Sequence, residues 1–225
     1  MSDAPTAPDA TPTAGPTLPR LNEPAPEFTA TTTQGTIALS DYRGRWVVLF
    51  SHPADFTPVC STEFLAFARE ASAFEARGAS LIGLSIDSVH AHLAWLHDLE
   101  QMTGEPVPFP VIADLDMKVS NRFGMIHPGA SETAAVRAVF LIDPEGVLRG
   151  MLYYPLNVGR SIPEVLRFLD ALQFSDAQKM STPADWTPGD PAIVKAPATM
   201  EEIRNDDPST YHDYRRWYLR LNEPA

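Results

Sequence analysis

One cysteine stands where its sulfur could be chemically reactive. Cys60 is the single cysteine among 225 residues, and it lies in the segment HPADFTPVCSTEF, between a proline-containing turn and an apolar helical pattern. The first N–H groups of a helix have no intrahelical partners, and the helix dipole favours negative charge there. This position therefore favours the thiolate, which is the nucleophilic form of the side chain. Thr57, three residues earlier, could place a hydroxyl beside the sulfur.

Cys60 and the histidines of the chain could instead have purely structural roles. A lone cysteine is often a small buried hydrophobic residue, although a position at a strand-to-helix turn favours the reactive role. Three histidines, His90, His92 and His97, lie in one predicted helix. His90 and His97 share a face and His92 points elsewhere, and no carboxylate pattern completes a ligand set. We therefore expect solvated or packing histidines, no metal site and no cofactor.

The middle of the chain must supply the elements that position Cys60. A short apolar run of the buried-strand type precedes the turn, and an amphipathic helical pattern follows it. The predicted strands are 46–51, 79–87, 137–143 and 147–154, and the predicted helices are 61–77, 88–102, 115–123 and 162–172. A Pro-Glu-Gly turn joins the last two strands as a hairpin. Strands separated by helices predict a three-layer α/β domain over residues 21–174.

The two ends of the chain differ from this middle. Of 22 prolines, seven fall before residue 27 and six after residue 175, so more than half lie at the ends. Residues 1–20 contain too few large apolar side chains to offset the entropy of ordering, and we expect a disordered tail. Residues 175–225 are rich in proline, aspartate and aromatic residues, and we expect an arm that packs on something else, such as a second subunit. The hexapeptide RLNEPA occurs at 20–25 and again at 220–225.

Charge and composition exclude several classes of protein. The 17 basic and 29 acidic residues give a net charge of -12. Such a chain is repelled by nucleic acid and by anionic lipid, so neither is an expected partner. No apolar run approaches the ~18 residues of a membrane span. One cysteine excludes an intrachain disulfide, and the N-terminus has neither an apolar core nor early basic residues, so we expect a cytoplasmic protein.

The segment around the cysteine resembles a known family. Pro53, Thr57 and Cys60 reproduce the P-x-x-x-T-x-x-C signature of the peroxiredoxins, and FSHPADFTPVCSTE is similar to their one-cysteine subfamily. Further similar segments are APEF (25–28), DLDMKVSNRFGMIHP (114–128), RAVFLIDPEG (137–146), YYPLNVGRS (153–161) and TPADWTPGD (182–190). The resemblance spans the chain except for the N-terminal tail. It implies a thioredoxin-like fold with a C-terminal extension, in agreement with the α/β prediction.

The resemblance also implies catalytic roles for four residues. Cys60 would attack the peroxide, and Thr57 would hydrogen-bond to the thiolate and to the peroxide. Arg137 would stabilise the thiolate and hold peroxide oxygen, because a guanidinium is permanently charged. Pro53 would shape the turn and shield the sulfur. The alternatives are a solvated arginine at the start of a strand and a threonine that only begins a helix.

Three further residues have supporting roles in this scheme. Glu63 matches a family glutamate that orients the arginines, and a capping role at the start of the helix is the alternative. Arg160 matches a second active-site arginine. His52 is similar to a histidine near the cysteine in one-cysteine members, and a hydrogen-bonded structural histidine is the alternative.

The implied function is a thiol-specific peroxidase. It would reduce hydrogen peroxide and organic hydroperoxides to water and alcohols through a sulfenic acid on Cys60. Because no second cysteine is present, an external thiol such as glutathione or a thioredoxin-type protein must regenerate the enzyme. We expect a homodimer or a higher oligomer. The alternatives are a sensor or holdase-like assembly that uses the same thiol, and a cysteine hydrolase with His52 as its base.

Overall fold

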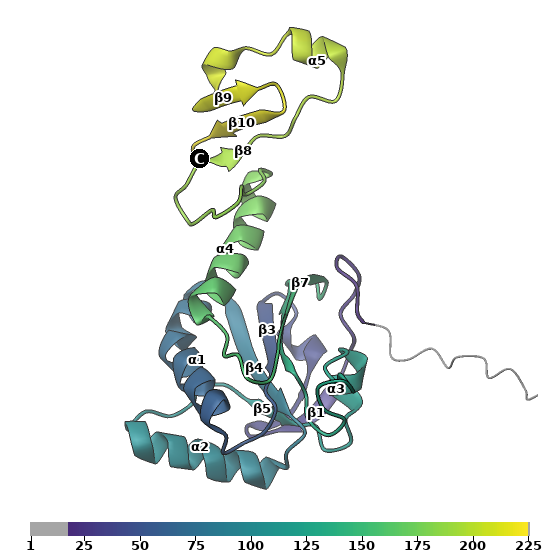
Figure 1. Ribbon diagram of the computed structural model, residues 1–225, viewed down its shortest axis with the longest axis vertical. Helices are drawn as coiled ribbons and strands as arrows, with labels where there is room; N and C mark the ends of the chain where they lie inside the picture. The colour runs from purple at the N-terminus through teal and green to yellow at the C-terminus, as the bar shows by residue number, and fades with distance from the viewer. Residues whose placement is uncertain (1–17, 225) are drawn as a thin grey trace, which may run out of the picture.

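A seven-stranded sheet forms the centre of the protein. The computed structural model describes residues 18–224, and Figure 1 shows the arrangement of its elements. The strand order is β2-β1-β5-β4-β3-β6-β7. The strands are β1 (Thr29–Thr32), β2 (Gly35–Ala38), β3 (Trp46–Ser51), β4 (Ala79–Ser85), β5 (Val111–Ala113), β6 (Arg137–Ile142) and β7 (Leu148–Tyr154). All six residues of β3 and of β6 are buried, as expected for strands covered on both faces.

Helices cover both faces of this sheet and confirm the predicted three layers. The helices are α1 (Pro58–Ala76), α2 (Val89–Thr103), α3 (Lys118–Arg122) and α4 (Ile162–Gln178), and a 3-10 turn, η1, spans Leu39–Tyr42. One apolar cluster joins side chains of α1, α2 and α4 to one face of the sheet. A second cluster joins α3 and the segment around Phe28 to the other face. Successive residues of β3 alternate between the two clusters, because strand side chains point to opposite faces.

The pairing of three strands determines which segments meet at one edge of the sheet. β3 runs parallel to β4 and antiparallel to β6, with Phe50 opposite Val139. β6 runs antiparallel to β7, with Arg137 opposite Tyr154. Consequently the end of β3, the start of β6 and the end of β7 lie at the same edge. The turn into α1, the first residue of β6 and the loop after β7 therefore come together.

The C-terminal region has more structure than the expected arm. α4 continues to Gln178 and so crosses the predicted boundary at 174 and the predicted helix end at 172. Beyond it lie β8 (Ala192–Ile193), α5 (Met200–Arg204), a 3-10 turn η2 (Pro208–Thr210), β9 (Asp213–Arg216) and β10 (Leu219–Asn222). These strands form a separate antiparallel sheet in the order β8-β10-β9, which lies beyond the end of α4 (Figure 1). The buried ring of Trp186 packs on Phe174 of α4, with ring centroids 4.8 Å apart.

The two RLNEPA copies lie in different parts of the fold. The first copy runs beside the start of β7, where Asn22 donates to the Leu148 carbonyl at 2.7 Å and Leu148 donates to the Glu23 carbonyl at 3.0 Å. The second copy begins within β10 of the small sheet. Most of the predicted N-terminal tail, residues 1–17, lies outside the described residues. Within residues 18–224, no helix combines the length and the apolar character that crossing a bilayer requires.

Candidate active site

Cys60 lies in the first turn of α1, as the sequence predicts. Thr57 is the N-cap residue, and Pro58 occupies the first helical position, where its missing N–H costs no hydrogen bond. The helix therefore begins three residues earlier than predicted and includes the cysteine. The side chain of Cys60 is fully buried and forms no disulfide. Its sulfur lies where the N-terminal end of the helix dipole favours negative charge.

Two acceptors hold Arg137 against this sulfur. Its Nη1 lies 3.3 Å from Cys60 Sγ and donates to Glu63 Oε2 at 2.7 Å. Its Nε and Nη2 both donate to the carbonyl of Leu156, at 3.0 and 2.8 Å. Antiparallel pairing of β6 with β3 and β7 brings these groups together, since Arg137 and Cys60 are 77 positions apart. The alternative of a solvated arginine is wrong, because Arg137 is only 3% exposed.

Glu63 joins the two arginines of the site. It lies three positions after Cys60 in α1, so both side chains share one face of the helix. Arg160, in the loop after β7, donates to Glu63 Oε1 through Nε and its backbone N–H, both at 2.8 Å, and to Oε2 through Nη2 at 2.6 Å. Its Nη1 donates to the carbonyls of Ser51 and Ala138 at 2.9 Å each. These contacts support an orienting role for Glu63 rather than a capping role.

The charges of this buried cluster are balanced when one further anion is present. Arg137, Arg160 and Glu63 are each at most 7% exposed, and two guanidiniums with one carboxylate leave a single net positive charge. A sulfur anion on Cys60 brings the cluster to zero. Burial by itself would raise the pKa of Glu63, but its hydrogen bonds with Arg160 and the charges of both arginines hold that pKa below its ordinary value.

Pro53 and Thr57 lie in the turn before the cysteine. The Thr57 hydroxyl donates to the Ala54 carbonyl at 2.9 Å, whereas we expected it to point at the sulfur. The side chain of Thr57 still retains lone pairs that can accept. Phe56 has a φ of 55°, which a bulky side chain seldom adopts, and it is 58% exposed. The turn is therefore held by groups other than the Phe56 side chain.

His52 is a buried, hydrogen-bonded histidine, and the structure pairs it with residues that sequence reasoning missed. Its Nε2 lies 2.9 Å from Asp55 Oδ1, and His92 Nδ1 lies 2.8 Å from Asp55 Oδ2. The sequence showed no carboxylate pattern that completes a ligand set with these histidines, but in the structure His92 lies with Asp55 and His52 in a group at metal-ligand spacing. His90 and His97 are exposed, as expected. The short spacing of His52 and Asp55 could have indicated their contact from the sequence, whereas His92 is 37 positions from Asp55 and no sequence pattern indicates that contact.

The cysteine sulfur contacts a guanidinium, which cannot serve as a base, so the geometry disfavours a cysteine hydrolase.

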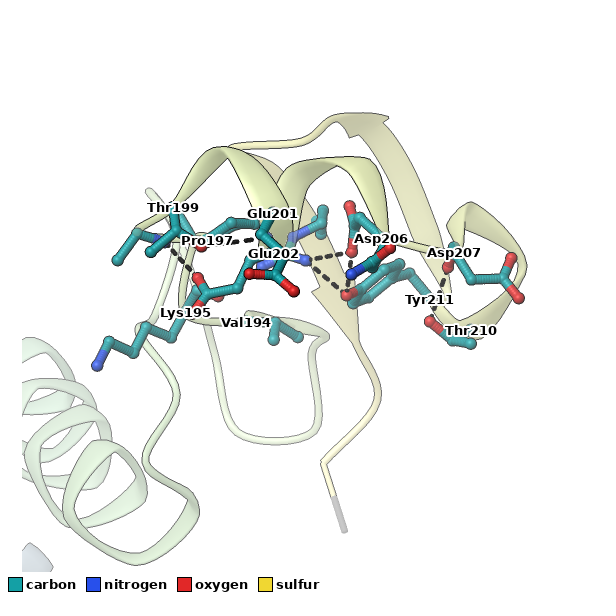
Figure 2. Close-up of a pocket in the computed structure, with 14 residues that line it drawn as sticks. Val194, Lys195, Pro197, Thr199, Glu201, Glu202, Asp206, Asp207, Thr210 and Tyr211 are labelled. Atoms are coloured by element: carbon teal, nitrogen blue, oxygen red, sulfur yellow. Dashed lines mark hydrogen bonds and ion pairs between the residues drawn. The ribbon is translucent and has the colours of Figure 1, made fainter.

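The C-terminal unit contains a pocket of about 930 Å³ that lies away from this chemistry. Figure 2 shows its polar lining, which includes Asp206 and Tyr211. Arg220 donates to Asp206 Oδ1 at 2.6 Å and to the Tyr211 hydroxyl at 2.5 Å, so its charge is already balanced inside the unit. Neither Cys60 nor Arg137 lines this pocket. The cluster around Cys60 and Arg137 is therefore separate from this pocket.

Comparison with known proteins identifies the family of this chain. Residues 21–151 match the AhpC/TSA family, and residues 171–206 match the C-terminal domain of 1-Cys peroxiredoxin. The chain is 51% identical over 206 residues to Peroxiredoxin 2 of Caldanaerobacter subterraneus subsp. tengcongensis, which covers 90% of this chain and 92% of that protein. The chain is a one-cysteine peroxiredoxin. This peroxiredoxin is also 51% identical to the peroxiredoxin of Aquifex aeolicus, over 87% of this chain and 88% of that protein.

Solved peroxiredoxin structures show the same fold. The yeast mitochondrial 1-Cys peroxiredoxin matches with a TM-score of 0.79 and 36% identity, covering 92% of this peroxiredoxin and 100% of that chain. A cysteine-to-serine variant of peroxiredoxin 6 from Arenicola marina matches with a TM-score of 0.79 and 35% identity, over 92% and 98% of the two chains. The thioredoxin-like fold is therefore confirmed. The protein is a thiol-dependent peroxidase, an antioxidant oxidoreductase that acts on peroxides.

Proposed function

We propose that Cys60 reduces hydrogen peroxide and organic hydroperoxides through a sulfenic acid. The thiolate attacks one oxygen of the O–O bond, so an S–O bond forms as the O–O bond breaks. The other oxygen leaves with the bonding pair and takes up a proton, giving water from hydrogen peroxide or an alcohol from an organic hydroperoxide. The sulfur is oxidised by two electrons and the peroxide is reduced by two, which leaves Cys60 as sulfenic acid.

The contact between Arg137 and Cys60 carries this proposal. A guanidinium 3.3 Å from the sulfur can stabilise the thiolate and bind a peroxide oxygen whose negative charge grows in the transition state. The Leu156 carbonyl and Glu63 hold Arg137 in place before the substrate arrives. Such preorganised charge in a buried site acts more strongly than it would in water. We also propose that Thr57 hydrogen-bonds to the peroxide and that Pro53 shields the sulfur.

We assign the return to the resting state to an external thiol. Cys60 is the only cysteine in the sequence, so a resolving disulfide within one chain is impossible. Two thiol molecules reduce the sulfenic acid, giving one disulfide, one water and the free cysteine. For the yeast mitochondrial 1-Cys peroxiredoxin, the resolving mechanism is described as using glutathione and thioredoxin systems. Glutathione or a thioredoxin-type protein is the corresponding reductant here.

We also propose a homodimer, or a higher oligomer, in a reducing compartment such as the cytoplasm. The small sheet β8-β10-β9 stands beyond α4 and exposes Trp217 and Tyr218, at 40% and 55%. Exposed aromatic side chains on a protruding unit favour contact with another subunit. A free cysteine without a disulfide partner fits a reducing compartment.

The experiment that tests the catalytic proposal compares two substitutions of Arg137. Stopped-flow mixing with one equivalent of hydrogen peroxide, followed by intact mass, measures the rate at which Cys60 gains one oxygen. We expect Arg137→Ala to lower this rate by about 100-fold or more, the usual cost of removing one preorganised donor. Arg137→Lys keeps the positive charge but loses the planar guanidinium, whose several N–H groups contact Cys60, Glu63 and Leu156 at the same time. We therefore expect an intermediate rate. An Arg137→Ala variant as fast as the wild type would refute the proposal.

A further inference from the structure

A buried cluster connects the turn before Cys60 to two distant elements. Asp55 Oδ1 lies 2.9 Å from His52 Nε2 at the end of β3, and Asp55 Oδ2 lies 2.8 Å from His92 Nδ1 in α2. His92 Nε2 lies 3.1 Å from the carbonyl of Ile112 in β5. The side chains of His52 and His92 are fully buried, and that of Asp55 is 2% exposed. His92 therefore bridges Asp55 to β5.

Both ring nitrogens of His92 face oxygen atoms. One ring nitrogen faces a carboxylate oxygen and the other faces a carbonyl oxygen, and both oxygens are acceptors. Both ring nitrogens of His92 therefore lie within hydrogen-bond distance of oxygen atoms, and the ring joins Asp55 to Ile112. Burial by itself would raise the pKa of Asp55, but the hydrogen bonds from His52 and His92 outweigh it and hold that pKa below its ordinary value.

Asp55 anchors the turn through its backbone as well as through its side chain. Its backbone N–H donates to Asp87 Oδ2 at 3.1 Å, and its neighbour Phe56 is exposed with a positive φ. Such backbone strain persists only where surrounding contacts over-determine it. The residue before Asp55, Ala54, supplies the carbonyl that accepts the Thr57 hydroxyl. A displacement of Asp55 would therefore move Thr57 and the start of α1.

We propose that His92 is a positioning residue of the peroxide site. It holds Asp55 so that Thr57 and Cys60 keep their positions relative to Arg137. This inference depends on the peroxidase function proposed above. His92 touches neither sulfur nor peroxide, and it acts through the turn at 53–57. The same three side chains have ligand atoms within 4.8 Å of one another, a spacing that could also suit a metal ion. Hydrogen bonds of 2.8–2.9 Å already occupy both oxygens of Asp55, which favours the positioning role.

Two amide substitutions separate the two bonds of His92. The side-chain nitrogen of asparagine replaces Nδ1, so His92→Asn keeps the bond to Asp55 and loses the bond to Ile112. The side-chain nitrogen of glutamine replaces Nε2, so His92→Gln keeps the bond to Ile112 and loses the bond to Asp55. Each variant loses one hydrogen bond of the same buried residue, and thermal unfolding of both variants measures how much stability each loses. His90→Gln, on the exposed side of the same helix, is the matched control.

The measured quantity is the second-order rate constant for oxidation of Cys60 by hydrogen peroxide. We expect His92→Gln to lower it roughly 10- to 100-fold, because small displacements of reacting groups have effects of this size. His92→Asn should lose only several-fold, and His90→Gln should match the wild type. Should His92→Gln not fold, Asp55→Asn alters the same contact from the other side and should lower the rate constant as strongly, with the fold checked by circular dichroism.

Three results would overturn the inference. His92→Gln could react as fast as the wild type, or both His92 variants could slow equally and only as far as they are destabilised, which would indicate a structural role. A stoichiometric metal ion in the purified wild type, measured by elemental analysis and lost in His92→Gln, would replace the hydrogen-bonded cluster by a metal site. A wild type that does not react with peroxide at all would instead refute the peroxidase proposal, so the two failures are distinguishable.

Discussion

Replacing Glu63 by glutamine tests whether one carboxylate holds the active-site arginines in place. The side chain accepts four hydrogen bonds, three from Arg160 and one from Arg137, at 2.6–2.8 Å. Glutamine offers one oxygen in place of two, and its amide N–H groups would face guanidinium donors. Glu63→Gln therefore loses at least two hydrogen bonds and removes the carboxylate charge that the two buried guanidiniums share.

The size of the effect follows from these contacts. Hydrogen bonds to charged groups contribute about 1.5–3 kcal/mol each, so the loss of two corresponds to roughly 3–6 kcal/mol. Removing one partner of a buried ion pair costs ~3–5 kcal/mol by an independent route, and the two ranges agree. The loss of negative charge also strengthens the positive potential at Cys60, which favours the thiolate. Displacement of Arg137 has the opposite effect on the rate of Cys60 oxidation. We expect this effect to be the larger one, because positioning errors cost roughly 100-fold in rate.

The assay combines urea unfolding with stopped-flow oxidation of Cys60. Glu75→Gln is the matched control, because Glu75 lies in the same helix but forms an exposed pair with Arg45 at 2.6 Å. Such surface pairs contribute only ~0–1 kcal/mol, so this variant should unfold and react like the wild type. If Glu63→Gln oxidised as fast as Glu75→Gln and unfolded at the same urea concentration, the proposed role of the carboxylate would be refuted.

Three further predictions concern stability and assembly. Burial lowers the pKa of His52 from its ordinary 6.5, so the unfolded chain takes up the proton first, and the free energy of unfolding should fall below pH 6.5 by up to ~1.4 kcal/mol per pH unit; His52→Gln should flatten this dependence in urea titrations. Gly150→Ala places a Cβ 2.6 Å from the Phe168 ring and should destabilise by about 1–3 kcal/mol in thermal unfolding, whereas Gly129→Ala meets no atom within 4 Å and should not; equal melting temperatures would contradict this. Trp217→Ser should weaken the proposed dimer in sedimentation experiments, and an unchanged mass at every concentration would count against that interface.

Local interactions explain why the sequence alone predicted the centre of the site. Thr57, Pro58 and Cys60 lie within one turn and one helix start, where capping and dipole effects depend on near neighbours. Glu63 was assigned from the resemblance, and helical spacing explains why it lies on the same face as Cys60, since residues three apart share a face. The three-layer α/β fold followed from apolar periodicity. The small C-terminal sheet was missed, because its short polar strands have no such period.

The contacts that make the cysteine an active site depend on tertiary structure. Arg137 and Arg160 were predicted from a resemblance, but their burial and their shared carboxylate result from the pairing of β3, β6 and β7. The Leu156 carbonyl leaves no signal in a side-chain pattern, since every residue carries the same group. His92 looked like a packing or solvated residue until the fold placed it on Asp55. Helix starts are determined by neighbouring residues, whereas contacts between distant residues depend on strand register and helix packing.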